Sequence, residues 1–221
     1  MPPKRNIYLV EAPSQYVLAS TFLRFQEHYE SPRFRGKIFS LEEFRRWYVS
    51  NVGEFSYYTD WNGFNIPSRV LMPFRESRFD PLSQKEKRLL KVTEKIKEPF
   101  YLIGAVVSTN LSTIKHEFVH GLFYTDPIYR RKVLRCLRDL DLRHFEEVLV
   151  GTSGYNPSFC NDEINAYATT GTSDLIDDGL DVAKVMPICQ VLRKLFREHF
   201  GFSLSRTNRK CILRQIYQIK L

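Results

Sequence analysis

The residues best suited to chemistry form one short motif, His116-Glu-Phe-Val-His120. On a helix, residues four positions apart lie on the same face, one turn apart. Two imidazoles placed in this way can bind one divalent cation, at about 2.0–2.1 Å each for zinc. Glu117 would project beside the open side of that metal, where its carboxylate can take a proton from bound water and pass it to a leaving amine. The spacing therefore predicts a zinc site with a general base next to it.

This chemistry requires the motif to lie on a helix. The apolar run at residues 100–107 predicts a strand, and the polar segment 108–113 supplies a turn and Ser/Thr candidates for the helix N-cap. We therefore expect a helix at about 112–124. The strand before it has two interpretations: an edge strand along which an extended peptide could align, or an internal strand, which its continuous apolar run favours.

The motif resembles the active-site helix of the zincin metallopeptidases. Gly121-Leu-Phe-Tyr-Thr-Asp-Pro follows His120 and lacks the Gly and His positions of the metzincin extension, so that branch is excluded. The resemblance implies a zinc-dependent hydrolase acting on a peptide or protein substrate, with Zn²⁺ as its cofactor. It also implies a zincin-like fold with a small sheet, an active-site helix and a helical C-terminal part. Residues 1–99 resemble no known domain.

A catalytic zinc site usually has three protein ligands and one open position. The candidates for the third ligand are His144, Glu146, Glu147, Asp162 and Glu163. We prefer Glu163, because small alanines follow it and would let its helix pack closely against the motif. Its segment is also similar to the glutamate-bearing helix of gluzincins. The competing interpretation of Glu163 is an ordinary acidic residue in the first turn of a helix.

Two further roles near the metal have several candidates. Asp162, Asn165 and Tyr167 could support a ligand histidine and fix its tautomer. In zincins a residue outside the ligand set commonly stabilises the developing oxyanion, and Tyr155, Tyr124, Tyr167 and His144 are the candidates for this role. We choose Tyr155 as the second catalytic residue beside Glu117, although a buried core tyrosine is an alternative for each of them.

The other local signals predict a mainly helical α+β protein with irregular strand and helix order. Capping boxes at Ser40–Glu43 and Ser83–Glu86 open helices to about 48 and 97, and Ser14 caps a helix at 15–29. We also predict a long basic helix at about 127–149, a helix at 162–169 and a last helix at 187–200. The segment 51–82 is predicted to be loops with one strand at 69–74, and 202–221 is predicted to hold a strand or a helix.

The chain of 221 residues is long enough for one sizeable core. We predict a single zincin-like domain over residues 1–221, with 1–82 as a candidate N-terminal subdomain and 51–82 as the candidate hinge. The four cysteines are far apart, without a CxxC pair, and are expected to be reduced. No apolar run approaches the length of a membrane span, and the start of the chain lacks the apolar part of a secretory signal. We therefore expect an intracellular, cytoplasmic protein without a membrane partner; its oligomeric state is open.

Charge supports a second hypothesis from another class. The chain carries 33 Lys+Arg against 25 Asp+Glu, a net charge of +8, and an arginine-rich segment at 129–143. Such a surplus attracts polyanions at long range, although it is also typical of a protein that avoids self-association. The alternative to a hydrolase is a basic nucleic-acid-associated or regulatory binding protein, with a structural or vestigial metal site.

Overall fold

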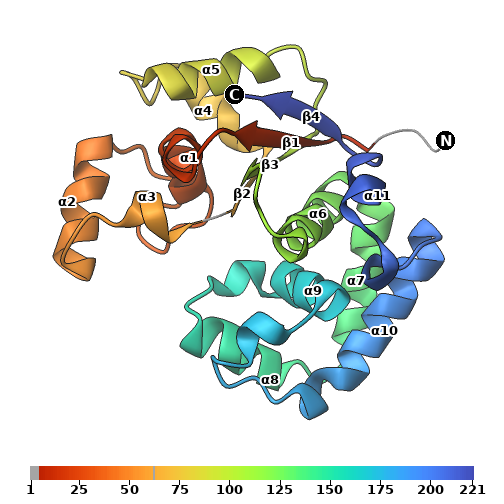
Figure 1. Cartoon of the computed structure of the whole chain (residues 1–221). Helices are drawn as coiled ribbons and strands as arrows, with labels where there is room; N and C mark the ends of the chain where they lie inside the picture. Colours follow the sequence, from red (N-terminus) through yellow and green to blue (C-terminus); the bar gives the residue numbers. More distant parts are fainter. Residues whose placement is uncertain (1–4, 62) are drawn as a thin grey trace. The chain divides into compact units, whose positions relative to one another are not determined.

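The computed structural model describes residues 5–61 and 63–221, which form two compact units (Figure 1). Unit 1 comprises the described residues of 1–110 together with Ile216–Leu221, and unit 2 comprises Leu111–Gln215. Helices predominate and the strands form one mixed sheet, so the predicted α+β class is confirmed. The zincin-like fold and the single-domain assignment stay predictions. The expected hinge at 51–82 lies wholly inside unit 1.

Unit 1 contains the sheet, with strand order β2-β3-β1-β4. Its strands are β1 (Ile7–Ala12), β2 (Gly63–Pro67), β3 (Tyr101–Val106) and β4 (Tyr217–Lys220). Strand β1 pairs in parallel with both β3 and β4, whereas β2 runs antiparallel to β3. The continuous apolar sequences of β1 and β3 suit these central places, because a central strand that is buried on both faces exposes no side to water.

Strand β3 is internal, so the edge-strand interpretation of 100–107 is wrong. Both of its backbone edges are already paired, one with β1 and one with β2, and no edge is left for a peptide. Gly104 in β3 is required by close packing. A Cβ atom at this position would lie 2.8 Å from the Phe22 ring, closer than real Cβ contacts come.

The helices of unit 1 follow the capping signals closely. They are α1 (Gln15–Glu30), α2 (Leu41–Val52), α3 (Tyr57–Asp60), α4 (Met72–Arg75), α5 (Gln84–Thr93) and the 3-10 turn η1 (Ser68–Leu71). Ser14 caps α1, and both predicted capping boxes are present at α2 and α5. These contacts are local, which is why a short sequence window predicts them.

The strand predicted at 69–74 is wrong, because η1 and α4 occupy that segment. Pro73 explains part of the difference: proline is accepted in the first turn of a helix and cannot donate a hydrogen bond within a sheet. The strand lies just before it, at β2, where Phe64 and Ile66 alternate toward the interior. The segment 51–82 thus contains short helices as well as loops.

Unit 2 consists of helices and turns. Its elements are α6 (Leu111–Thr125), α7 (Pro127–Arg138), α8 (Arg143–Glu146), the π-helical turn η2 (Glu147–Thr152), η3 (Pro157–Phe159), α9 (Cys160–Thr170), η4 (Ser173–Leu175), α10 (Val182–Phe200), η5 (Leu204–Arg206) and α11 (Arg209–Leu213). Helix α9 packs against both α6 and α10. The segment 202–221 holds both of its predicted alternatives, α11 and β4. In the part of the chain that is described, no helix is long and apolar enough to cross a membrane.

The long basic helix predicted at 127–149 is wrong, because the segment divides into α7, α8 and η2. Helix α7 ends where Asp139 follows its last arginine, and a negative charge is unfavourable at the carboxyl end of a helix. Asp141 then accepts a hydrogen bond from the backbone N–H of Arg143 at 3.2 Å, just before the next helix begins. The apolar periodicity continues through the break, and this misled the sequence prediction.

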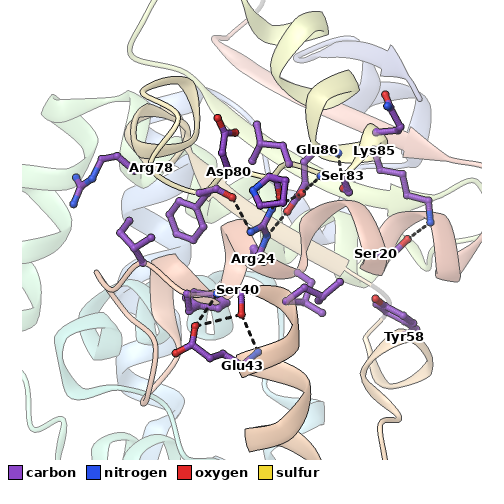
Figure 2. Close-up of a pocket in the computed structure, with 18 of the residues that line it drawn as sticks. Ser20, Arg24, Ser40, Glu43, Tyr58, Arg78, Asp80, Ser83, Lys85 and Glu86 are labelled. Carbon is purple, nitrogen blue, oxygen red and sulfur yellow. Dashed lines mark hydrogen bonds and ion pairs between the residues drawn. The ribbon is translucent and has the colours of Figure 1, made fainter.

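A buried ion pair connects α1 and α5 inside unit 1. The Nε and one terminal nitrogen of Arg24 donate to the two oxygens of Glu86, each at 2.7 Å, and both side chains are almost fully buried. The guanidinium also donates to the carbonyls of Phe79 and Pro81, so it lies between the helix and the loop before α5 (Figure 2). The pair forms part of the wall of a cavity of about 690 Å³ in this unit.

Removal of this arginine should strongly destabilise the protein. Arg24→Met leaves the Glu86 carboxylate buried without its counter-ion, and breaking such a pair typically costs about 3–5 kcal/mol. Urea unfolding would measure the loss. The control is Arg46→Met, because the Arg46–Glu42 pair is well exposed and should contribute less than about 1 kcal/mol. Equal losses for the two variants would contradict the assigned role of the buried pair.

Candidate metal centre

Helix α6 brings the two motif histidines together, as predicted. Ile114, Phe118 and Leu122 are fully buried and fix one face of the helix in the interior of unit 2. His116 and His120 lie one turn apart, and their Nε2 atoms approach to 3.0 Å. Two imidazoles that present the same nitrogen to one point form half of a tetrahedral metal site.

Helix α9 supplies the carboxylate that completes the group. Glu163 Oε2 lies 3.6 Å from Nε2 of His116 and 3.6 Å from Nε2 of His120. This oxygen is buried and accepts no hydrogen bond. The approach depends on tight packing, since Ala166 and Ala168 in α9 are fully buried and α9 packs against α6. His116, His120 and Glu163 therefore form a cluster that could bind a metal ion, with its ligand atoms all within 4.8 Å of one another.

The dimensions of the cluster fit a small tetrahedral cation. Ligands at about 2.0–2.1 Å from zinc are separated by about 3.3 Å in a tetrahedron. The two Nε2 atoms lie 3.0 Å apart and each lies 3.6 Å from Glu163 Oε2, so the observed separations fall on both sides of about 3.3 Å. A buried carboxylate oxygen without a hydrogen bond is also costly unless a cation compensates it. Both the separations of the donor atoms and the buried negative charge of the carboxylate thus suit a divalent metal.

Asp162 supports the second histidine from behind. Its Oδ1 lies 3.0 Å from Nδ1 of His120, the ring nitrogen that faces away from the cluster. Such a carboxylate partner keeps the proton on Nδ1 and leaves Nε2 as the ligand atom. Of the three candidates for this supporting role, Asp162 is therefore the one in position. Asn165 instead accepts a hydrogen bond from the buried hydroxyl of Tyr129, at 2.8 Å.

The pKa values around the cluster show how strongly its charges interact. Burial disfavours the charged form of His120, but the carboxylates of Asp162 and Glu163 outweigh it and raise the pKa of His120 well above its usual range. Burial also raises the pKa of Asp162. Burial alone would also raise the pKa of Glu163. The positive charge on His120 outweighs the effect of burial, so the pKa of the Glu163 carboxyl is lowered. The raised pKa of His120 thus follows from the buried carboxylates that surround it.

A small pocket opens onto the cluster within unit 2. It has a volume of about 210 Å³, and His116 and Glu117 line it together with residues from η4, α9 and the loop before α9. Glu117, the predicted general base, is buried in the middle of α6 and lies near His120, since its charge contributes to the raised pKa of that histidine. Glu117 and one histidine of the cluster, His116, therefore share one accessible cavity.

Two tyrosines line the same pocket. The hydroxyl of Tyr155 lies 2.9 Å from that of Tyr167, and the Tyr167 ring lies edge-on to His116 with a centroid distance of 4.5 Å. Burial raises the pKa of Tyr155 well above its usual range and that of Tyr167 to about 12, so both hydroxyls stay protonated at neutral pH. The two hydroxyls are thus hydrogen-bonded to each other at the wall of the pocket, and the Tyr167 ring packs against His116.

The other candidates for the third ligand lie outside the cluster. His144 Nε2 accepts a hydrogen bond from the backbone N–H of Asp181 at 2.8 Å, which fastens the start of α10. Its Nδ1 faces Glu147 at 3.7 Å, while Glu146 lines a different depression on the surface of unit 2. Tyr124, the remaining oxyanion candidate, does not line the pocket.

Sequence reasoning missed Asp174. This exposed residue of η4 lines the pocket beside Tyr167, and its charge contributes to the raised pKa of the tyrosine. The sequence Asp174-Leu-Ile-Asp-Asp178 is typical of a solvated acidic turn and gave no sign of a place near the motif. Only the reversal of the chain at Gly171, with a φ of 152°, brings this turn back beside α9.

No protein-family model, no curated protein and no solved structure matches this chain. The resemblance to zincins therefore rests on the residues of the motif and of the later glutamate-bearing helix.

Metal analysis can decide which carboxylate binds. We expect Glu163→Gln to lower the affinity for Zn²⁺ by at least about tenfold, because an amide oxygen carries no charge to balance the cation. Calorimetric titration of the metal-free protein would measure the change. Glu147→Gln removes the same charge from an exposed alternative candidate and should leave the affinity unchanged. A loss of affinity in the Glu147 variant but not in the Glu163 variant would exclude the assigned cluster.

Proposed function

We propose that the protein is a zinc-dependent metallopeptidase or related amide hydrolase. One observation carries the proposal: two imidazole nitrogens and one carboxylate oxygen converge on a point beside a pocket that Glu117 also lines. The cluster found among the described residues has three ligands, the number typical of a catalytic zinc site. A structural zinc site has four. The open side and the adjoining carboxylate therefore favour catalysis over a structural role.

Each side chain at the site has a separate role in the proposed reaction. Zinc bound at the cluster would supply Lewis-acid polarisation of the scissile carbonyl and would lower the pKa of water. Glu117 removes a proton from the attacking water and returns it to the leaving amine. Tyr155 donates a hydrogen bond to the oxygen on which negative charge develops, and Tyr167 positions Tyr155. Asp162 keeps His120 in the tautomer that the cluster needs.

The pocket also indicates a substrate preference. Its two ionisable carboxylates are those of Glu117 and Asp174, and no Lys or Arg is among the described residues that line it. This is notable in a chain with a net charge of +8. A volume of about 210 Å³ suits one side chain better than a drug-sized ligand, which needs about 300–1,000 Å³. We infer that a basic side chain of the substrate occupies the pocket next to the scissile bond.

Replacement of the general base tests the hydrolase proposal. Glu117→Gln keeps the size of the side chain but cannot accept a proton, and we expect turnover to fall by about 10²–10⁴-fold with zinc binding retained. The assay is cleavage of a mixed peptide library by the zinc-loaded protein, followed by mass spectrometry. Glu146→Gln, in α8, is the matched control and should cleave as wild type does. Equal cleavage by the Glu117 variant and wild type would rule out this mechanism.

The substrate preference depends on Asp174. Because this carboxylate is exposed, its attraction for a basic side chain is worth about 0.2–1 kcal/mol, or about 1.4- to fivefold in kcat/KM. Asp174→Lys should reverse the preference between two peptides that differ only by Lys or Glu beside the cleaved bond. An unchanged ratio of kcat/KM would contradict the assigned pocket while leaving the hydrolase proposal intact.

A further inference from the structure

Helix α7 presents a row of three arginines to solvent. Arg131, Arg135 and Arg138 are spaced four and three positions apart, so they lie on one face of the helix. All three side chains are exposed. The opposite face, formed by Tyr129, Val133 and Leu137, is buried within unit 2. The row is therefore held on a rigid helix rather than on a loop.

The three charges are not neutralised by the rest of the described chain. None of the three arginines of the row forms an ion pair or a side-chain hydrogen bond there, and α7 contains no acidic residue. Arg138 borders a surface depression that Asp141 and Glu146 also line, but Asp141 pairs with Arg143.

The other two basic residues of α7 are engaged elsewhere in unit 2. Arg130 lies over the Phe123 ring at 5.4 Å, and Lys132 Nζ lies 3.3 Å from Nδ1 of His199. The row thus concentrates the unpaired positive charge of the helix on its most exposed face.

We propose that the row formed by Arg131, Arg135 and Arg138 binds the phosphate backbone of double-stranded nucleic acid. With a rise of 1.5 Å per residue, the arginines are spaced about 6 and 4.5 Å apart along the helix axis. Guanidinium groups are suited to phosphates, because their planar N–H donors can bind two oxygens at once. Three such groups on one exposed helix face can each bind a phosphate of the same backbone.

The structure favours a duplex over other polyanions. Single-strand binders usually add exposed aromatic rings on which bases stack, but the one aromatic residue of α7, Tyr129, is fully buried. A basic helix that binds a membrane surface needs a free apolar face, and the apolar face of α7 is already packed. The helix also lacks Asn and Gln, the residues that read adenine in the major groove.

Salt dependence gives the test a quantitative form. Each neutralised phosphate of a duplex contributes about −0.9 to the slope of log K against log salt, so three arginines contribute about −2.7. This part of the affinity falls about 40-fold between about 50 and 200 mM salt. The measurement is fluorescence anisotropy of the full chain with a labelled DNA duplex and with an RNA duplex of the same sequence.

The decisive variant replaces all three arginines by glutamine, which preserves helix propensity. We expect its slope to be shallower by about 2.7, with the duplexes bound at least about tenfold more weakly at low salt. The single variant Arg135→Gln should lose about 0.9 of the slope. It keeps the test valid if the triple variant unfolds, which circular dichroism would reveal.

A control of equal charge separates the row from the general surplus of positive charge. Lys87, Arg88 and Lys91 are exposed residues of α5, and their replacement by glutamine removes the same three charges. If both triple variants weaken binding equally, or if wild type shows no salt-dependent binding, the proposal is overturned. It is also overturned if polyglutamate competes as well as unlabelled duplex, since the row would then be a site for acidic proteins. Binding by Glu117→Gln should match wild type, because the row does not depend on the proposed hydrolase activity.

Discussion

The candidate site depends on the compensation of charge in a buried place. The charges of Glu163, Asp162 and Glu117 all act on His120, and the first two carboxylates lie 3.6 and 3.0 Å from its ring nitrogens. Burying carboxylates costs several kcal/mol each unless cations compensate them. His120 lies between two of these carboxylates, and its raised pKa follows from their charge. The packing of α9 against α6 holds the carboxylates of Asp162 and Glu163 at 3.0–3.6 Å from the histidine nitrogens.

Two neighbouring carboxylates on α9 have different tasks because the helix turns between them. Asp162 reaches Nδ1 of His120, and Glu163 reaches Nε2 of both histidines. His120 is therefore held from opposite sides, which fixes its ring orientation before any ligand arrives. Groups that are already oriented require no reorganisation when a metal or a substrate binds, and this is the main physical advantage of building a site on packed helices.

The same unit separates its charges by location. Negative groups line the pocket beside the metal cluster, whereas an unpaired basic row lies on the outer face of α7. Charges on a solvent-exposed helix interact with distant groups only weakly, because water and salt screen them, whereas the buried carboxylates beside His120 are screened much less. The large positive net charge of the chain thus describes its surface and says little about the environment of the candidate site.

Local interactions of the sequence predicted the motif on its helix, the caps of α1, α2 and α5, the central strand β3 and the helix that carries Glu163. Each depends on residues within a few positions, or on a spacing that a helix converts directly into a face. Tertiary packing alone decided the rest. It placed the short strand at Gly63–Pro67 rather than at 69–74, ended α7 at Arg138, chose Asp162 over Asn165 and Tyr167, and brought Asp174 to the pocket. Those outcomes depend on which groups become neighbours after the chain folds back, and neither spacing nor composition carries that information.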